Sequence, residues 1–480
     1  NYKEIYSTIS KHINENDSND DFYLDNFIIQ LITSFKKIHC IDIKVIDEKT
    51  AYEVFITVNA KNDPLTSFDL TKTLVLNQID AKTKTDEDKW NNIIVNINNE
   101  VKGITPQSFL RYYWIGKYEF VQDRMLFDSI QRHGAYDNPL DYKKKDFIPR
   151  KKRAENKKLF YKNLVDELDR SSLVLRNIKK SDVHYFKENF GAKRGQQIAS
   201  SLEQINKFET VKQPYIYILS LINNALISKN KVDSDTFLHV TRAVSKIIRS
   251  IEVFSFEFHI LAGGQANKVE RTVYSNYGKE LYNINDNIGK NKKWHEKWTV
   301  HQVRKISDIL EKTLSTHLRD NDSTISDMVS NLRYDSKKTV SIRYVFEKIN
   351  QVLHNQNHLS FNSNASIEHI LPQNPKKWGL EPKEIKDYVH SIGNLVVIPG
   401  TLNNDLSDSS FEDKVNGVKD TKKQQINKLS DDQTAVNQEL WGNLKKTLEE
   451  SSVWNENDIK KRAKKIGELF HKAVSKYKGS

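Results

Sequence analysis

Apolar residues recur at helical spacing along much of the chain. In segments 215–226, 236–256 and 300–318 they return every three or four residues, which places them on one face of a helix. Proline and glycine fall mostly in short breaks between such segments. This pattern predicts a helical body that spans residues 101–335.

The first hundred residues mix two periods. Residues 41–46 alternate apolar and polar positions, as strands do, whereas the apolar residues of 51–59 fall on one helical face. After a turn, Thr66 or Ser67 is placed to cap a further helix. We expect a separate domain at residues 1–100.

The C-terminal region, residues 336–480, combines helices with short apolar runs. Amphipathic helices are predicted at 343–353 and 454–477, and between them one run ends near His369 while another covers 395–398. The expected fold is therefore mostly α with small β elements, with a helical body and a C-terminal domain.

Composition narrows the class of protein. A chain of 480 residues suggests about two to four domains, and its formal charge of +12 favours phosphate-rich partners. The single cysteine, Cys40, excludes an intrachain disulfide framework and a multi-cysteine zinc site. It suits a reducing, cytoplasmic compartment. No apolar run reaches membrane-spanning length, so we expect no membrane association.

Candidate chemistry gathers around the two apolar runs. Phosphodiester hydrolysis needs an activated water and stabilisation of phosphate charge. A neutral imidazole, here His369, suits the first task, and a divalent cation with oxygen ligands suits the second. Glu368 could reach a metal only where the strand turns, Asn394 could hold the histidine loop, and Asn403 or Asn404 could offer an oxygen.

A bland interpretation of the same residues stays open at this point. His369 would then be a packed strand histidine and the asparagines would form turns. Other histidines, His390 among them, stand isolated in the sequence and are interpreted as surface or packed residues. Spacing alone does not decide between the two.

Residues from about Tyr344 to Phe470 resemble the C-terminal HNH domain of GmrSD-type, modification-dependent restriction endonucleases and their antiphage relatives. The resemblance rests on Ile-Glu-His-Ile-Leu-Pro-Gln at 367–373, Ile-Gly-Asn-Leu at 392–395, Leu-Asn at 402–403, Phe411 with Lys414, and Trp454 with Ile459 and Arg462. It implies a ββα-metal nuclease domain.

The resemblance also implies roles for individual residues. His369 looks like the general base, Asn394 like the central asparagine, and Asn403 like the third HNH position. Glu368 and Asn403 would be on the metal side, and the implied cofactor is Mg²⁺ or Mn²⁺. Lys414 would be an auxiliary phosphate or structural contact.

DNA, from phage or modified, is the implied partner. Arg462 would also be an auxiliary phosphate or structural contact, and the helix face with Lys460 and Lys464 lies next to the nuclease segment. The cationic stretch 143–158 is interpreted as a solvated loop, with nucleic-acid contact as the minority alternative. No sequence signal indicates an oligomeric state.

Residues 54–65 and 69–72 resemble part of the ParB-like NTPase or sensor domain that precedes the nuclease in this family. The family's Asp-Gly-Gln-Gln-Arg motif, associated with nucleotide use, is missing, and Arg-Gly-Gln-Gln at 194–197 lacks both of its ends. The chain starts without a methionine or signal peptide, so we expect an absent upstream part that uses a nucleotide.

Two function classes follow. The first is a metal-dependent DNA endonuclease or nickase of a restriction or phage-defence system. The second is a catalytically silent DNA-binding or assembly subunit that retains the HNH fold. The intact His369, Asn394 and Asn403 favour the first.

Overall fold

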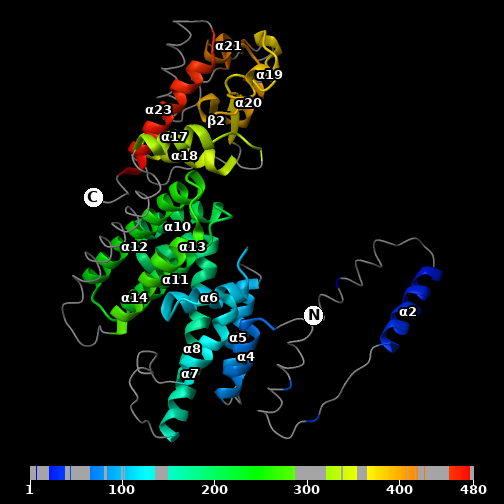
Figure 1. The fold of residues 1–480 in the computed structure, drawn as a ribbon, viewed down its shortest axis with the longest axis vertical. Coiled ribbons are helices and arrows are strands. Elements are labelled where there is room, and N and C mark those ends of the chain that lie inside the picture. Colours follow the sequence, from blue (N-terminus) through cyan, green and yellow to red (C-terminus); the bar gives the residue numbers. More distant parts are fainter. Residues whose placement is uncertain are drawn as a thin grey trace. The chain divides into compact units, whose positions relative to one another are not determined.

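The chain divides into two units, residues 1–64 and 65–480. The computed structural model describes residues 21–37, 65–79, 84–98, 101, 103–135, 150–286, 321–336, 339–353, 365–406, 408–416, 418–419, 426–427 and 453–475, and the single residues 7, 44 and 54 (Figure 1). In the first unit the described helix is α2 (Asp21–Lys36). The strand expected at 41–46 and the helix expected at 51–59 lie almost wholly outside the described residues. The domain boundaries expected after residues 100 and 335 stay predictions.

Helices form nearly all of the described residues between 65 and 286. They are α4 (Ser67–Gln78), α5 (Lys84–Asn98), α6 (Pro106–Lys117), η1 (Asp123–Met125), α7 (Leu126–Ala135), α8 (Arg150–Lys180), α9 (Val183–Phe190), α10 (Ala192–Lys207), α11 (Pro214–Lys229), α12 (Ser234–Phe254), the π-helix η3 (Ser255–Leu261), α13 (Ala266–Val269), the π-helix η4 (Glu270–Ser275) and α14 (Asn276–Asp286). The helices expected at 215–226 and 236–256 are confirmed as α11 and α12, whereas 300–318 lies outside the described residues.

Local sequence explains where these helices begin. Thr66 caps α4 through a capping box with Asp69, and Asp233 caps α12 by accepting the Thr236 amide at 2.8 Å. Residues 150–158, expected in a solvated loop, instead form the first turns of α8, since Arg, Lys, Ala and Glu all favour helix. The rest of that cationic stretch lies outside the described residues.

The core of the helical body surrounds α11. This helix is apolar on nearly every side, buries most of its side chains, and packs against α6, α8, α12 and α14. Trp90, Trp114 and Tyr161 are fully buried in the same cluster. An all-round apolar helix at the centre leaves the amphipathic helices to face solvent.

The C-terminal part adds short strands to further helices. Its elements are α17 (Asn321–Asn331), α18 (Thr339–Leu353), β1 (Ala365–His369), η7 (Lys376–Trp378), α19 (Pro382–Ile385), η8 (Ile392–Asn394), β2 (Leu395–Pro399), α20 (Gly400–Leu406), α21 (Phe411–Asn416), β3 (Val418–Lys419), β4 (Ile426–Asn427) and α23 (Glu456–Ser475). The helices expected near 343–353 and 454–477 are confirmed as α18 and α23. The prediction of a mostly helical chain with small β elements is also confirmed.

β1 and β2 pair antiparallel, with His369 opposite Leu395. Alternate residues of β2 enter different cores: Leu395 and Val397 join a cluster with α18 and α23, while Val396 and Ile398 join one with Leu406 of α20. Both faces of β2 are therefore buried, which fixes the strand and the histidine paired with it.

The first of these clusters is shared with the helical body. Phe208, Val253 and Phe256 pack with Tyr344 of α18 and Phe470 of α23. A buried ion pair between Lys348 and Glu252 also joins α18 to α12. A search of the described residues for a helix that could cross a membrane finds none.

Candidate active site

His369 lies at the end of β1 and is held on both sides of its ring. Its Nε2 is 3.3 Å from Nδ1 of His390, and its Nδ1 is 3.4 Å from Nε2 of Gln373. The Tyr334 ring meets it edge-on at 4.6 Å between centroids. Only 5% of the residue is exposed. The imidazole is thus fixed in orientation inside a small polar group.

His390 is held in this position because the segment at residues 333–334 pairs with the segment at 390–391. Tyr334 donates its amide to the carbonyl of His390 at 2.8 Å, and its ring stacks on the His390 ring. Arg333 forms a β-bridge with Ser391 and donates from its guanidinium to the carbonyls of Asp387 and Lys386 at 2.7 and 3.1 Å. Sequence reasoning set His390 aside because no local pattern links it to His369.

These surroundings keep His369 neutral. Burial, assisted by His390 and Lys414, lowers the pKa of His369 to about 3. Burial and Arg333 also lower the pKa of His390. With the Gln373 amide nitrogen facing Nδ1, His369 carries its proton on Nε2, donates it to His390, and keeps a lone pair on Nδ1. The Nδ1 lone pair accepts from the Gln373 amide, so this neutral imidazole can take up a proton there only when that contact opens. A pKa of about 3 makes it a weaker base than an imidazole that titrates near neutrality.

Glu368 is engaged by Lys414. The ammonium of Lys414 donates to Glu368 Oε1 at 2.5 Å and to the carbonyl of His369 at 2.8 Å. Burial raises the pKa of Glu368 and lowers that of Lys414, and their attraction opposes both shifts. Lys414 is 0% exposed, and its ammonium is used on Glu368 and the His369 carbonyl. Its expected contact to phosphate stays a prediction.

Asn394 clamps the loop after His369. Its Oδ1 accepts from the Leu371 amide at 2.8 Å and the Trp454 indole at 3.1 Å, and its Nδ2 donates to the carbonyls of Leu371 and Val389 at 2.9 and 2.8 Å. Both ends of the amide are saturated, as expected for a residue that bridges backbone groups. Asn394 therefore positions the loop.

Arg462 lies beneath the same turn. Its Nη1 donates to the carbonyls of Gly393 and Leu395 at 2.7 and 2.8 Å, and burial lowers its pKa to about 9. Its side chain is inside the protein and contacts backbone carbonyls, and its expected contact to phosphate stays a prediction. By contrast, Lys460 and Lys464 of α23 are exposed, and Lys460 forms an ion pair with Glu456 at 2.7 Å.

The residues expected to bind a metal ion, Glu368 and Asn403, do not form a complete set of ligands. Asn403 is half-buried on α20 and its side chain makes no hydrogen bond to a described residue, while Asn404 is exposed. Among the described residues no three His, Cys, Asp or Glu side chains gather as a metal cage would need. The oxygen donors seen here do not by themselves form a divalent-cation site, because Lys414 occupies the Oε1 side of Glu368.

Residues 318–469 match the family model for the C-terminal domain of GmrSD restriction endonucleases. This confirms the resemblance over that part of the chain and extends it to α17, which precedes Arg333 and Tyr334. Every element of the histidine site described above lies within the match. None of the curated proteins compared with the chain matches it.

Proposed function

We propose that the chain is a nuclease of a restriction or phage-defence system whose C-terminal part cleaves DNA at an HNH-type site. The observation that carries the proposal is His369, a neutral imidazole held at the end of β1 by His390 and Gln373. The order β1, β2, α20 is that of a ββα unit, and the family match covers it. A cytoplasmic location is part of the proposal.

In the proposed reaction, a water molecule takes the place of the Gln373 amide at Nδ1 of His369, and Nδ1 removes a proton from it. The water oxygen forms a bond to phosphorus, the bond from phosphorus to the ester oxygen breaks, and the leaving oxygen takes up a proton. His390 accepts the Nε2 proton of His369 in a hydrogen bond and so fixes the tautomer, as the third member of a catalytic triad does. Asn394 holds the loop that carries the base.

We propose Mg²⁺ or Mn²⁺ as cofactor, with Glu368 and Asn403 as the residues that would hold it. A bound divalent cation supplies charge stabilisation for the phosphate and the leaving oxygen. Glu368 is engaged by Lys414, so it would hold the cation only after that ion pair opened. An upstream nucleotide-using domain and modified or phage DNA as substrate belong to the same proposal.

The second candidate is a silent DNA-binding or assembly subunit. Two observations favour it: His369 is only 5% exposed, and Glu368 is neutralised by Lys414. In that case the same network would only stabilise the fold.

A plasmid-nicking assay with Mg²⁺ separates the two functions. The His369→Ala variant should lose roughly 10²–10⁴-fold in rate because the base is gone. EDTA should abolish cleavage by the wild type, and Mn²⁺ should restore it. No nicking by the wild type would favour the silent subunit. Equal nicking by wild type and His369→Ala, with contaminating nuclease excluded, would overturn His369 as the base.

Variants of His390 test the orienting role in the same assay. His390→Leu removes the partner of Nε2 and should cost about 10–100-fold in rate, a range typical of residues that orient a functional histidine. His390→Asn can keep one hydrogen bond near the place of Nδ1 and should retain more activity. Equal loss in both variants would indicate a packing role instead.

A further inference from the structure

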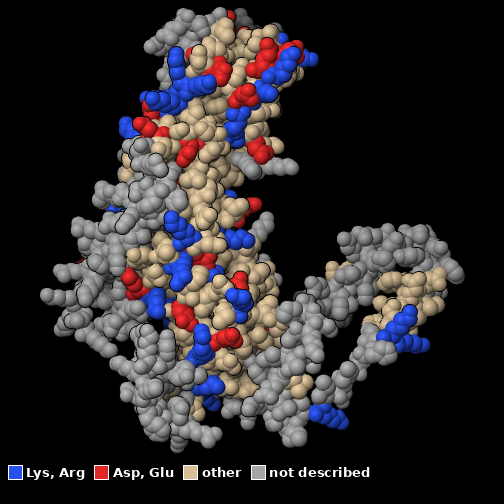
Figure 2. Space-filling model, viewed as in Figure 1, with Lys and Arg blue, Asp and Glu red and all other residues tan. Residues whose placement is uncertain are grey.

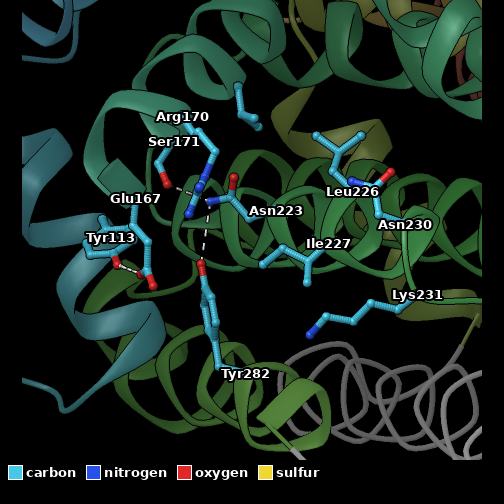
Figure 3. Close-up of a pocket in the computed structure, with 11 residues that line it drawn as sticks. Tyr113, Glu167, Arg170, Ser171, Asn223, Leu226, Ile227, Asn230, Lys231 and Tyr282 are labelled. Atoms are coloured by element: carbon cyan, nitrogen blue, oxygen red, sulfur yellow. Dashed lines mark hydrogen bonds between the residues drawn. The ribbon is translucent and has the colours of Figure 1, made fainter. Parts of the chain in front are cut away.

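The helical body contains a cavity of about 440 Å³ outside the residues that match the nuclease family. It is formed by α6, α8, α11, the residues just after α11, and α14 (Figure 3). Its size is within the range of small-molecule sites, which are mostly apolar with a few convergent polar groups. The proposed nuclease chemistry makes no use of it.

Polar groups meet on one side of the cavity around Asn223. Figure 3 shows its amide between the Ser171 and Tyr282 hydroxyls, to which Nδ2 donates at 3.0 and 3.4 Å. These three residues are buried and come from three different helices. The amide uses its nitrogen on the protein and keeps its oxygen as an acceptor on the cavity side, since no described residue donates to it.

The charges around the cavity are unbalanced. Glu167 is neutralised, because it accepts from Tyr113 and pairs with Lys117. Arg170 and Lys231 are exposed lining residues, and neither forms an ion pair with a described residue. Two positive charges therefore line the cavity without an ion pair to a described residue, although the charge of Arg170 acts on the neighbouring Asp169.

The remaining wall is aliphatic. Val174, Leu226 and Ile227 line it, and Leu226 and Ile227 stay half-buried although neighbouring positions of α11 are fully covered. A ligand that matched this site would carry a dianionic group for the two cations, an apolar body for the wall, and a polar edge for Asn223.

We propose that this cavity binds a small organic phosphate monoester. Arg170 and Lys231 contact its phosphate, the aliphatic wall covers its body, and Asn223 with Tyr282 meets its polar edge. Binding would join α6, α8, α11 and α14 and so stabilise the helical body. The proposal is independent of the nuclease function.

Calorimetric titration of the full chain with phenyl phosphate tests the site. We expect saturable binding, roughly tenfold or more tighter than that of inorganic phosphate, which lacks the body, or of phenol, which lacks the charge. Arg170→Gln and Lys231→Gln should each weaken binding about tenfold, since each removes a charge-assisted contact. The matched control is Lys162→Gln, an exposed cation of α8 that does not line the cavity, and it should bind like the wild type.

Two results would overturn the proposal. One is phenyl phosphate binding no tighter than inorganic phosphate, which would mark a non-specific cationic surface. The other is an equal loss in the Lys162 and Arg170 variants. Because both lining variants alter exposed side chains, their thermal unfolding should match the wild type in the absence of ligand, which separates lost binding from lost fold.

Discussion

His369 owes its chemical state to neighbours from distant parts of the sequence. Gln373 follows it in the chain, but His390 and Tyr334 arrive through the crossing of two other segments. Together they bury the ring and disfavour its charged form. The consequence is an imidazole that stays neutral well below its ordinary titration range.

This shift makes the stability of the fold depend on pH. The unfolded chain binds a proton on His369 below about 6.5, whereas the folded chain binds it only near pH 3, so the free energy of unfolding falls as pH drops through that window. His369→Gln should reduce the decline of the urea midpoint between pH 7 and pH 4.5. The control is His184→Gln, at an exposed position. An unchanged decline would contradict the buried neutral state.

Lys414 offers a test of the buried ion pair. Lys414→Met would leave Glu368 buried without its partner, which typically costs about 3–5 kcal/mol. Adding Glu368→Gln should restore most of that loss in urea unfolding. Lys377→Met is the matched control, because Lys377 pairs with Asp408 at 2.8 Å on the surface and should cost less than about 1 kcal/mol. Similar costs for both lysines would mean that the Glu368 pair is not buried in solution.

Sequence reasoning reached some of these residues and missed others for a physical reason. The Glu-His pair and the Gly-Asn-Leu turn are local patterns, so Glu368, His369 and Asn394 could be singled out. His390 and Tyr334 act through tertiary contacts that leave no local trace. Burial of Lys414 and Arg462 was equally invisible, because a cation in a sequence gives no sign of the carboxylate or carbonyls that will enclose it.

At the scale of elements, the turn η8 and the helix α23 approach closely. A Cβ at Gly393 would lie 2.0 Å from the carbonyl oxygen of Ile459 and 2.8 Å from the amide nitrogen of Ala463. Arg462, between these two residues, caps the carbonyls on either side of Asn394. Only glycine lets the asparagine turn rest on the helix.

Gly393→Ala should therefore separate η8 from α23. We expect a loss of about 1–3 kcal/mol or more, since backbone atoms cannot move aside as side chains do. Gly467→Ala, also on α23, is the milder comparison, because its nearest neighbour is a side-chain methyl of Ile325 at 2.9 Å and not backbone. Urea unfolding measures both; a Gly393 variant as stable as the wild type would rule out this close contact.

The spacing of apolar residues in the sequence was enough to predict the regular α-helices. The apolar stripes of α12, α18 and α23 and the apolar run of α11 could all be found in the sequence. The π-helical turns at 255–261 and 270–275 could not, because a few residues do not distinguish four-residue from five-residue spacing. Residues 150–158 were misjudged since charge density suggested a loop while helix propensity decided the outcome.

For the whole molecule, the formal net charge is +12. Figure 2 shows basic side chains along α23 with acidic ones between them. Lys460, Lys461 and Lys464 are exposed there, whereas Arg462 of the same helix is not. A DNA track on this helix would therefore use the lysines alone.

Binding to duplex DNA should weaken steeply as the salt concentration rises. On a plot of the logarithm of the binding constant against the logarithm of the salt concentration, each neutralised phosphate adds about −0.9 to the slope. Reversing Lys460, Lys461 and Lys464 to Glu should flatten that slope. The same reversal at Lys162, Lys187 and Lys193, exposed cations of the helical body, should leave it unchanged. Fluorescence anisotropy at several salt concentrations gives the slopes. Equal flattening by both sets would show that net charge, not this helix, governs binding.

The cluster shared by Phe208, Val253 and Phe256 with Tyr344 and Phe470 bears on how this protein can be divided or recombined. A fragment that began at the start of the family match would carry Tyr344 and Phe470 without the aromatic side chains that cover them. Such a fragment would expose an apolar patch to water and tend to aggregate. The part that matches the family model therefore cannot be moved alone into another protein, and any exchange that keeps it folded must carry α12 and η3 with it.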